Sequence, residues 1–547
     1  MHASVRIAAL AATAALAAAQ DAPRLRSIEV LRSDVFSDQE ASGNPLYWFG
    51  NLLHIVTDEP VIRREVWMQP GDRVTPDEAA ELERNLREFG LFGSVHTQLV
   101  PAGDGEQDLV VTTRDRYSLS LNASVASVGG VQRYNFGLSE SNLFGTGKSL
   151  GVTGTHTGTE RQESLNLFDP QFLGTWHQLA AQVGDTDEGH FANVSLRRPF
   201  HHLDDPYTYG ADWAAITQRI DYYRRGDSTA EVPLDSDVVH LFAAAGSGPR
   251  DQRQALGLDL RLRRLDYSDA TGPDAGRVHV PGDTRDVEFG PYWTIDDRPR
   301  YDKIRGLDAF DYDEDLVLGT HLSVRAAARY RDEDGAGTAL EPVLDLDATA
   351  AFTPWPDTYV TMAGSVTGRV DDGRLVGWRT GAALHAYLLG LPAQTFAGSL
   401  TFDAATEQQD LQPQLTLGED NGLRGYPARE FAGTKRWRLN LEDRFDTGLE
   451  LLAVHLGATA FFDVGWINDG DSSLSLGDAV RGVGCGLRFG SSHWLGSRVV
   501  RVDVSKPLDE VGGRSFSVSV SFAMGQVFTF FGNASVLGSE FEQAGLR

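Results

Sequence analysis

The chain has 547 residues, with 77 acidic and 49 basic side chains and a formal net charge of −28. This balance argues against a nucleic-acid partner, which would require a basic face. The one cysteine, Cys485, excludes both an internal disulfide framework and a cysteine-based zinc site.

The N-terminus is typical of a secretory signal peptide. A positively charged start precedes an apolar run that ends on Ala17-Ala18-Ala19, a pattern for cleavage. We predict a signal peptide over residues 1–19, which would direct the chain out of the cytoplasm. No later run reaches 18 apolar residues. This excludes a helical membrane protein and leaves a β-barrel open, because barrel strands alternate between apolar and polar residues.

Residues 24–116 combine strand and helix patterns. "RLRSIEVLR" predicts a strand and "PVIRREVW" a short helix. "TPDEAAELERNLREFG" predicts a second helix, because Thr75 is a good N-cap, Pro76 suits the first turn and Glu78 completes a capping box. Its apolar stripe has helical spacing and consists of Ala79, Leu82, Leu86 and Phe89. A hairpin of "SVHTQLV" and "DLVVTTRD" completes a small α+β module, with an insertion near residues 33–58.

The stretch "SNLFGTGKS" at residues 141–149 ends like a nucleotide-binding phosphate loop. Such a loop needs a glycine where this chain has Asn142, and it opens an apolar helix. The stretch that follows, "SLGVTGTHTG", is instead rich in Gly and Thr. We therefore predict a turn between two strands, with glycines where a positive φ is required.

Residues 117–528 alternate with a period of two. Polar rows consist of small residues and paired charges, which favours a transmembrane antiparallel β-barrel over a soluble all-β protein. Acidic segments such as "RDEDGAGTALEP" and "RRGDSTAEVPLDSD" predict tall loops on one side. Roughly 25 residues per strand and connection predict about 16 strands. In "SFSVSVSFAM" the predicted outward row comprises Phe516, Val518, Val520, Phe522 and Met524.

Several motifs, taken in chain order, resemble the BamA/TamA superfamily of outer-membrane assembly and translocation barrels, also catalogued as bacterial surface antigens. The stretch "VWMQPGDRVTPDEAAELERNLREFGLFGSVHTQLV" resembles one of the family's POTRA domains. "GLSESNLFGTGKSLG" resembles an early hairpin, and "NGLRGYPARE" the tip of a loop that folds back into the barrel lumen. "RWRLNLEDRF", "FFDVG" and "VSFAMGQVF" resemble later strands. The resemblance covers nearly the whole mature chain and is strongest over residues 418–528.

The resemblance implies three sets of site residues. The lumen-loop motif is Arg424, Gly425 and Tyr426. The expected partners of this loop are Glu442 and Asp463, because alternation places both carboxylates on inward, polar rows. An inserted guanidinium would meet them with bidentate geometry, whereas the alternative leaves Arg424 as a solvated loop tip. The last strand supplies the barrel-seam and terminal signal, which consists of Phe522, Gly525 and Phe528.

Other candidate sites are weak. His201 and His202 lie beside two aspartates and could bind a metal, but a polar loop is the simpler interpretation. His493 follows two serines without the G-x-S-x-G elbow of a hydrolase. Arg488 and Asp503 are expected to point inward as a lumen pair. We expect no catalytic residue, metal or cofactor, and therefore no enzyme.

The resemblance implies a protein of the bacterial outer membrane that assists the assembly, insertion or translocation of other proteins. Its POTRA domain in the periplasm would capture unfolded or nascent outer-membrane proteins, or one secreted protein, by strand addition. A weak seam between the first strand, near residues 117–127, and the last, near residues 515–528, would open toward the lipid bilayer. The single POTRA-like module and a tail at residues 529–547 depart from the family. The alternative is a passive or single-partner transport or secretion barrel.

Overall fold

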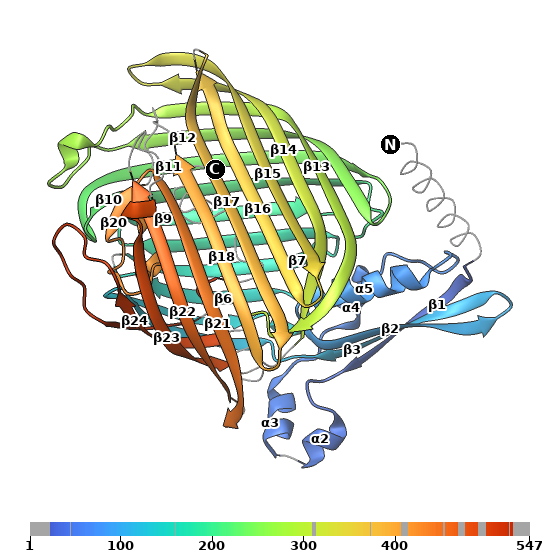
Figure 1. Cartoon of the computed structure of the whole chain (residues 1–547). Helices are drawn as coiled ribbons and strands as arrows, with labels where there is room; N and C mark the ends of the chain where they lie inside the picture. The colour runs from blue at the N-terminus through green and yellow to red at the C-terminus, as the bar shows by residue number, and fades with distance from the viewer. Residues whose placement is uncertain are drawn as a thin grey trace.

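The chain forms a small α+β module followed by a large closed β-barrel (Figure 1). The predicted signal peptide at residues 1–19, Gly525 and the tail at residues 529–547 lie outside the part of the chain that is described. Within that part, no helix combines the length and the apolarity needed to cross a bilayer. The computed structural model describes residues 22–43, 45–158, 160–308, 313–371, 373–405, 414–451, 454–468, 476–490, 499–524 and 526–528.

The module contains a three-stranded sheet in the order β1-β3-β2, with β1 parallel and β2 antiparallel to β3. The predicted strand, helices and hairpin are all present, and the insertion forms two additional helices, α2 and α3. The elements are β1 (Arg24–Ser33), α2 (Asp38–Gly43), α3 (Pro45–Leu53), α4 (Glu59–Glu65), α5 (Pro76–Glu88), β2 (Phe92–Gly103) and β3 (Glu106–Asp115).

Helix α5 begins and packs as its sequence predicts. The Glu78 backbone N–H donates to Thr75 Oγ1 at 3.3 Å, and the Thr75 N–H donates to Glu78 Oε2 at 2.8 Å, which completes the capping box. The apolar stripe faces the sheet, where Leu82 and Leu86 are fully buried in the core of the module. The module therefore has a hydrophobic core of its own.

The barrel is closed and antiparallel, and in the described part of the chain it has 20 strands. Chain neighbours pair with each other throughout, and β25 returns to β4 to close the ring. The strands are β4 (Leu119–Val128), β5 (Val131–Glu140), β6 (Ser149–His156), β7 (Arg161–Phe172), β8 (His177–Thr186), β9 (Gly189–Arg198), β10 (Tyr207–Arg224), β11 (Asp227–Ser247), β12 (Gln252–Tyr267), β13 (Thr284–Arg305), β14 (Asp313–Glu333), β15 (Gly337–Trp355), β16 (Thr358–Asp371), β17 (Arg374–Leu391), β18 (Gln394–Ala405), β21 (Lys435–Leu451), β22 (Val454–Asn468), β23 (Val480–Gly490), β24 (Val499–Pro507) and β25 (Ser519–Met524).

The prediction of about 16 strands is wrong because the acidic segments are not loops. Residues 331–342 continue β14 and β15, which exchange pairs as far as Glu333 and Gly337. Residues 224–237 likewise lie almost entirely in the β10–β11 hairpin. The polar composition reflects strands that continue into water, so these two connections are short and the residues expected in loops belong to strands.

Alternation divides the barrel wall into an apolar outside and a charged inside, as predicted. On β4, Leu119 and Leu121 are 62% and 67% exposed on the outer surface. On the inner surface, Arg325 donates to Asp259 and Asp345 at 2.7 and 2.9 Å. An exposed apolar exterior around a buried ionic interior is the arrangement required of a barrel surrounded by lipid.

The barrel wall is uneven in height. Strands β10 to β17 run for 14 to 22 residues, whereas β4 to β9 have 8 to 12 and β25 has six. Since β23 and β24 have 11 and 9 residues and β25 neighbours β4, the low part of the wall is continuous from β23 through β9. We call it the short wall.

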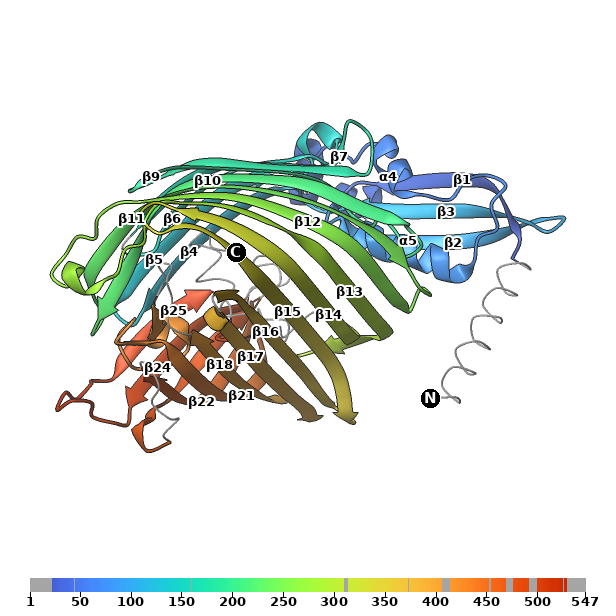
Figure 2. The same cartoon turned by 90° about the horizontal axis from the view of Figure 1, so that it is seen from above.

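The module docks on turns of the short wall (Figure 2). The β5–β6 connection contains the stretch "SNLFGTGKS" and forms a turn with a short 3-10 helix at Leu143–Gly145, which confirms the predicted hairpin turn. Gly145 accepts a hydrogen bond from the Asp58 N–H at 2.8 Å. Asn142 Nδ2 donates to Thr57 Oγ1 at 2.9 Å. The stretch that resembles a phosphate loop therefore fastens the module to the barrel.

Candidate functional site in the lumen and at the seam

The connection between β18 and β21 folds back into the barrel lumen. Two short strands, β19 (Leu415–Leu417) and β20 (Phe431–Gly433), pair with each other and hold the ends of the loop together. Between them, the Asn421 side chain accepts from the Gly418 N–H at 2.8 Å and donates to the Thr416 carbonyl at 2.9 Å. We call residues 414–434 the lumen loop.

Glycine at position 425 lets the lumen loop approach the barrel wall closely. Gly425 has a φ of +97°, and a Cβ there would lie 3.1 Å from Pro507 Cδ at the end of β24. A side chain at this position would be strained by its backbone and crowded by the wall. Gly425 thereby places its neighbours, Arg424 and Tyr426, against opposite parts of the lumen.

Arg424 is fully buried and meets both predicted partners. Its Nε and Nη2 donate to Asp463 Oδ2 and Oδ1 at 2.7 and 2.8 Å, and its Nη1 donates to Glu442 Oε1 at 2.6 Å. The guanidinium carbon also lies 3.5 Å from the centre of the Phe461 ring. This bidentate, charge-assisted geometry fixes the loop tip to β21 and β22. The structure therefore brings Arg424, Glu442 and Asp463 together, and Arg424 is not a solvated loop tip.

The ionic cluster extends beyond the residues that the sequence predicted as partners. Arg444 Nε donates to Glu442 Oε2 at 2.9 Å. The expected lumen pair is present, with Arg488 Nη1 donating to Asp503 Oδ1 at 2.5 Å, and Arg501 Nη1 donates to Asp503 Oδ2 at 2.8 Å. Alternation predicts which residues face inward, but only the register of β22, β23 and β24 shows that they meet.

Tyr426 holds the other half of the loop tip. Its ring is buried and packs edge-on against Phe431 and Phe516, with ring centres 5.5 and 5.0 Å away. Its hydroxyl donates to the Arg481 carbonyl at 3.0 Å. Phe516 was expected in the outward row of the last strand, but β25 starts only at Ser519. Phe516 instead precedes the strand and packs on the lumen loop.

We call the junction of β25 and β4 the seam. Among the described residues it has one register pair, Phe522 with Ser127. By comparison, β24 and β25 share six pairs from Val500–Met524 to Ser505–Ser519, and β4 and β5 share ten. Within the described part of the barrel, the seam therefore has the fewest register pairs of any junction.

The lumen loop bonds to both sides of the seam. Toward β4, Glu419 Oε2 accepts from the Gly129 N–H at 2.8 Å, and the Ala428 N–H donates to the Gly129 carbonyl at 2.9 Å. Toward β25, Arg514 Nη1 donates to Glu430 Oε1 at 2.7 Å. Gly129 lies in the β4–β5 turn and Arg514 in the β24–β25 connection. The loop therefore bridges the two hairpins that meet at the seam.

The end of the described chain leaves the barrel wall and enters the lumen. Phe528 was expected as the terminal aromatic of the last strand, but β25 ends at Met524. Phe528 is instead buried against Tyr387 and His385, and its carbonyl accepts from Arg444 Nη2 at 3.1 Å. Phe522, the other described member of the predicted signal, lies at the seam itself. The contact with Arg444 connects the C-terminal segment to the Arg424 cluster.

Replacing Phe528 by alanine is expected to loosen this attachment. The aromatic side chain belongs to a buried apolar cluster with Leu307 and Leu316, so its loss should lower the free energy of unfolding by about 3 kcal/mol. Urea unfolding in detergent micelles measures this value. Val518→Ala, at a side chain that is 56% exposed, is the matched control. An unchanged midpoint for Phe528→Ala would contradict the buried placement.

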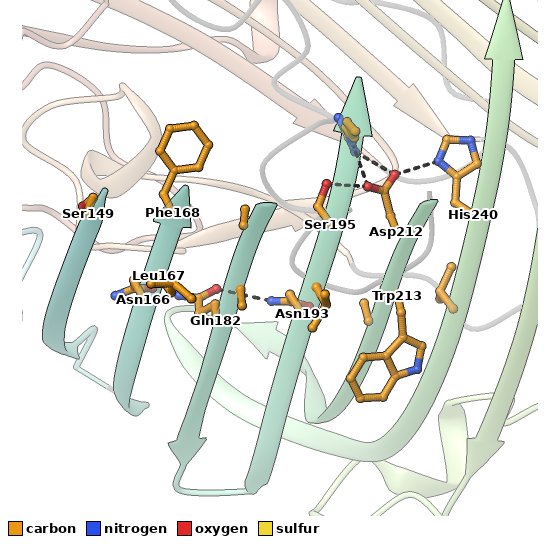
Figure 3. Close-up of a pocket in the computed structure, with 16 residues that line it drawn as sticks. Ser149, Asn166, Leu167, Phe168, Gln182, Asn193, Ser195, Asp212, Trp213 and His240 are labelled. Atoms are coloured by element: carbon orange, nitrogen blue, oxygen red, sulfur yellow. Dashed lines mark hydrogen bonds and ion pairs between the residues drawn. The ribbon is translucent and has the colours of Figure 1, made fainter. Parts of the chain in front are cut away.

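A polar group on the inner wall looks like a serine hydrolase triad but is connected differently (Figure 3). Ser195 Oγ donates to Asp212 Oδ1 at 2.6 Å, and His240 Nδ1 lies 3.1 Å from Asp212 Oδ2. Arg197 also pairs with Asp212 through two bonds of 2.7 Å. The carboxylate therefore lies between serine and histidine, whereas nucleophile activation needs the histidine there. We interpret this group as a cross-strand ionic network.

The two histidines considered for metal binding lie at the contact between barrel and module. His201 stacks on Trp176 and His202 on Trp67, with ring centres 4.2 and 5.0 Å apart. Among the described residues, no group of three or more His, Cys, Asp or Glu side chains is placed to hold a metal ion. Stacking on tryptophan accounts for the positions of both rings.

Glu65 of α4 is the buried carboxyl of this contact. Gln171 Nε2 donates to Glu65 Oε1 at 2.6 Å, and His201 Nδ1 lies 3.8 Å from Glu65 Oε2. Burial raises the pKa of Glu65 to about 7, against the smaller lowering effect of Gln171. Burial also lowers the pKa of His201 to about 4. Both groups are therefore neutral near pH 6, so the two side chains do not form an ion pair, and His201 Nε2 lies instead 3.2 Å from the Glu65 backbone carbonyl.

We predict that Glu65 weakens the contact between the module and the barrel as the pH rises. Because the pKa of Glu65 is raised in the folded state, its contribution to stability is fully present below pH 4.5, the ordinary pKa of the group. This contribution is lost as the pH rises to about 7. His201, whose pKa is lowered from 6.5 to about 4, acts in the opposite direction between these two pH values, so the effect of Glu65 is measured against a variant that retains His201. Relative to Glu65→Gln, the wild type should therefore lose about 3 kcal/mol of unfolding free energy across this range. Unfolding of both proteins at several pH values measures the difference, with exposed Glu59→Gln as control. A constant difference would contradict the burial of Glu65.

Comparison with known proteins gives one match in sequence. No family model matches the chain. A segment of 160 residues is 31% identical to the outer membrane protein assembly factor BamA of Neisseria meningitidis serogroup B. The sequence is similar to that of BamA. The match covers 27% of this chain and spans about a fifth, 20%, of the BamA relative. It supports a barrel of the BamA/TamA type.

Among solved structures, the comparison gives BamA from Haemophilus ducreyi lacking POTRA domains 1–3. That structure is 12% identical with a TM-score of 0.44, and the alignment covers 92% of this chain and 84% of the other. CdiB from Escherichia coli is 12% identical with a TM-score of 0.47, over 92% and 76% of the two chains. CdiB from Acinetobacter baumannii is 14% identical with a TM-score of 0.44, over 92% and 74%.

Proposed function

We propose that this chain is an outer-membrane barrel of the BamA/TamA type that assists the assembly, insertion or translocation of other proteins. The observation that carries the proposal is the seam. It has one register pair among the described residues, and a loop anchored by a buried arginine connects its two sides. A barrel that only conducts solutes does not need a weak junction of this kind.

In the proposed mechanism, the seam separates and exposes two strand edges. Unpaired edges are templates for another strand, so a client strand can pair with β4 or β25. The lumen loop determines how easily the edges part, because it bonds to Gly129 on one side and carries the partner of Arg514 on the other. While the edges separate, the ion pairs of Arg424 with Glu442 and Asp463 hold the loop in place. No cofactor or covalent step takes part.

The N-terminal module acts, in this proposal, as a single POTRA domain in the periplasm. Its sheet has β1 and β2 at its edges, and an extended client can add to such an edge through backbone hydrogen bonds. Docking on the turns of the short wall places the module near β4. A captured segment is thereby delivered close to the seam.

Depletion of the protein, followed by quantitative proteomics of the outer membrane, tests the proposal. Assembly activity predicts that a group of other barrels falls while their transcripts hold, and that wild-type protein restores them. A loss confined to one secreted partner would indicate a dedicated secretor. If no other protein changes, the chain is a passive barrel and the assembly function is wrong.

A further inference from the structure

The two-helix insertion of the module is fastened at the point where the chain enters the barrel. Asp115, at the end of β3, is buried and accepts from the Thr57 N–H at 2.7 Å. His54 Nε2 lies 3.0 Å from the same carboxylate. Asn51 of α3 exchanges two hydrogen bonds with the Phe36 backbone, at 3.1 and 2.8 Å. Helix α3 is therefore held at a fixed place next to residues 115–119.

One face of α3 is apolar and exposed. Trp48, Phe49 and Leu52 are 57%, 52% and 61% exposed, and Ile55 just beyond the helix is 52% exposed. These positions follow helical spacing, so they form one continuous stripe. The sequence Pro45–Leu53 contains no charged side chain. In water, a stripe with two aromatic rings and no neighbouring charge is unfavourable.

The opposite face of α3 packs on Tyr117, two residues before the first barrel strand. A Cβ on Gly50 would lie 1.6 Å from the Tyr117 hydroxyl, so the absence of a side chain permits this contact. Tyr117 also packs edge-on against Phe36 at 6.0 Å between ring centres. Tyr117 is 47% exposed and lies two residues before Leu119, where β4 and its outward row of Leu119 and Leu121 begin. Helix α3 therefore lies beside the start of the lipid-facing row of β4, and its exposed stripe is on the face turned away from Tyr117.

We propose that α3 is a membrane-surface helix whose apolar stripe enters the bilayer leaflet on the module's side of the barrel, next to β4. Its nine residues are too few to cross a bilayer. Aromatic and aliphatic side chains at the boundary of headgroups and acyl chains bind by apolar burial, and tryptophan is favoured at this depth. Because no charge accompanies the stripe, the partner is the acyl region of the leaflet and not an anionic headgroup. The helix fixes the height of the first strand and the module relative to the membrane.

Spin labels on the full-length protein in phospholipid vesicles test this placement. Cys485→Ser removes the lone cysteine, and Phe49→Cys or Leu52→Cys then receives a nitroxide. Depth follows from the ratio of collision rates with oxygen, which concentrates in lipid, and with a water-soluble nickel chelate. We expect both positions to give a ratio several-fold above that of Glu106→Cys, an exposed site on the module, and close to that of Leu121→Cys on β4.

The result that overturns the proposal is a ratio at both positions equal to that of Glu106→Cys. Protection from a water-soluble thiol reagent in cell envelopes, combined with exposure in pure vesicles, would assign the stripe to a protein partner and would also overturn it. Both labelled residues are exposed, so the variants should retain the heat-resistant mobility of a folded barrel. The test does not depend on protein assembly activity, so its outcome is independent of the proposed function.

Discussion

Replacing Arg424 by alanine is expected to release the lumen loop and to destabilise the barrel by about 3–5 kcal/mol, because the change removes the cation paired with buried Asp463 and one of the cations paired with buried Glu442. Glu442 and Asp463 are both fully buried beside the guanidinium, so water cannot replace its hydrogen bonds. The measurements are urea unfolding in detergent and the heat-resistant mobility of the folded barrel. Arg424→Lys should recover little, since an ammonium group cannot form the bidentate pair with Asp463.

The matched control for Arg424 is Arg481→Ala. Arg481 also pairs with a carboxylate through two atoms, Asp509 at 2.5 and 3.1 Å, but its side chain is 53% exposed. Water solvates both partners there, so its loss should change stability little. Adding Asp463→Asn to Arg424→Ala should return part of the lost stability, because it removes one of the orphaned charges. If Arg424→Ala and Arg481→Ala behave alike, the Arg424 loop does not brace the lumen.

A disulfide across the seam is expected to abolish the proposed assembly activity while leaving the barrel folded. Phe522 and Ser127 are register partners, so Phe522→Cys with Ser127→Cys, in a Cys485→Ser background, places two thiols on neighbouring strands. Directly opposed residues of antiparallel strands lie within disulfide range. The oxidised variant should fail to restore outer-membrane barrels after depletion of the wild type, and a reducing agent should restore activity.

The control for the seam disulfide uses the next junction. Val504→Cys with Val520→Cys joins β24 to β25 at another register pair on the outer surface. This junction does not need to open in the proposed mechanism, so the oxidised control should retain activity. Full activity of the oxidised seam variant, with the crosslink shown by its gel mobility, would exclude lateral opening.

Alternation predicted the architecture but not the ends of the strands. The outward row of Leu119 and Leu121 was evident from the sequence because lipid requires apolar residues at every second position. Phe528 was expected on the last strand because "VSFAMGQVF" resembles the family's terminal strand, although the alternating row itself ends at Met524. The chain leaves the ladder after Met524, and a side-chain pattern does not show where backbone pairing stops.

The ionic cluster around Arg424 was predictable only as far as it depends on which side chains point into the lumen. Glu442 and Asp463 could be placed inward by alternation, and the resemblance of the loop motif connected Arg424 to them. Asp503 joins the cluster through the pairing of β23 with β24. No local sequence pattern indicates which residues of two strands will lie opposite each other. The docking of "SNLFGTGKS" on the module was also beyond prediction, because its partners are nearly 90 residues away in the chain.

The uneven height of the barrel wall has a consequence for the surrounding lipid. Six residues of β25 extend about 20 Å even before tilt, whereas a hydrocarbon core is about 30 Å thick. The bilayer must therefore compress beside β25 and relax toward the longer strands on the far side. Compression costs a fraction of a kcal/mol per Å. In the proposed mechanism a client strand enters at this thin region, so the height of the wall would add to the effect of the weak seam.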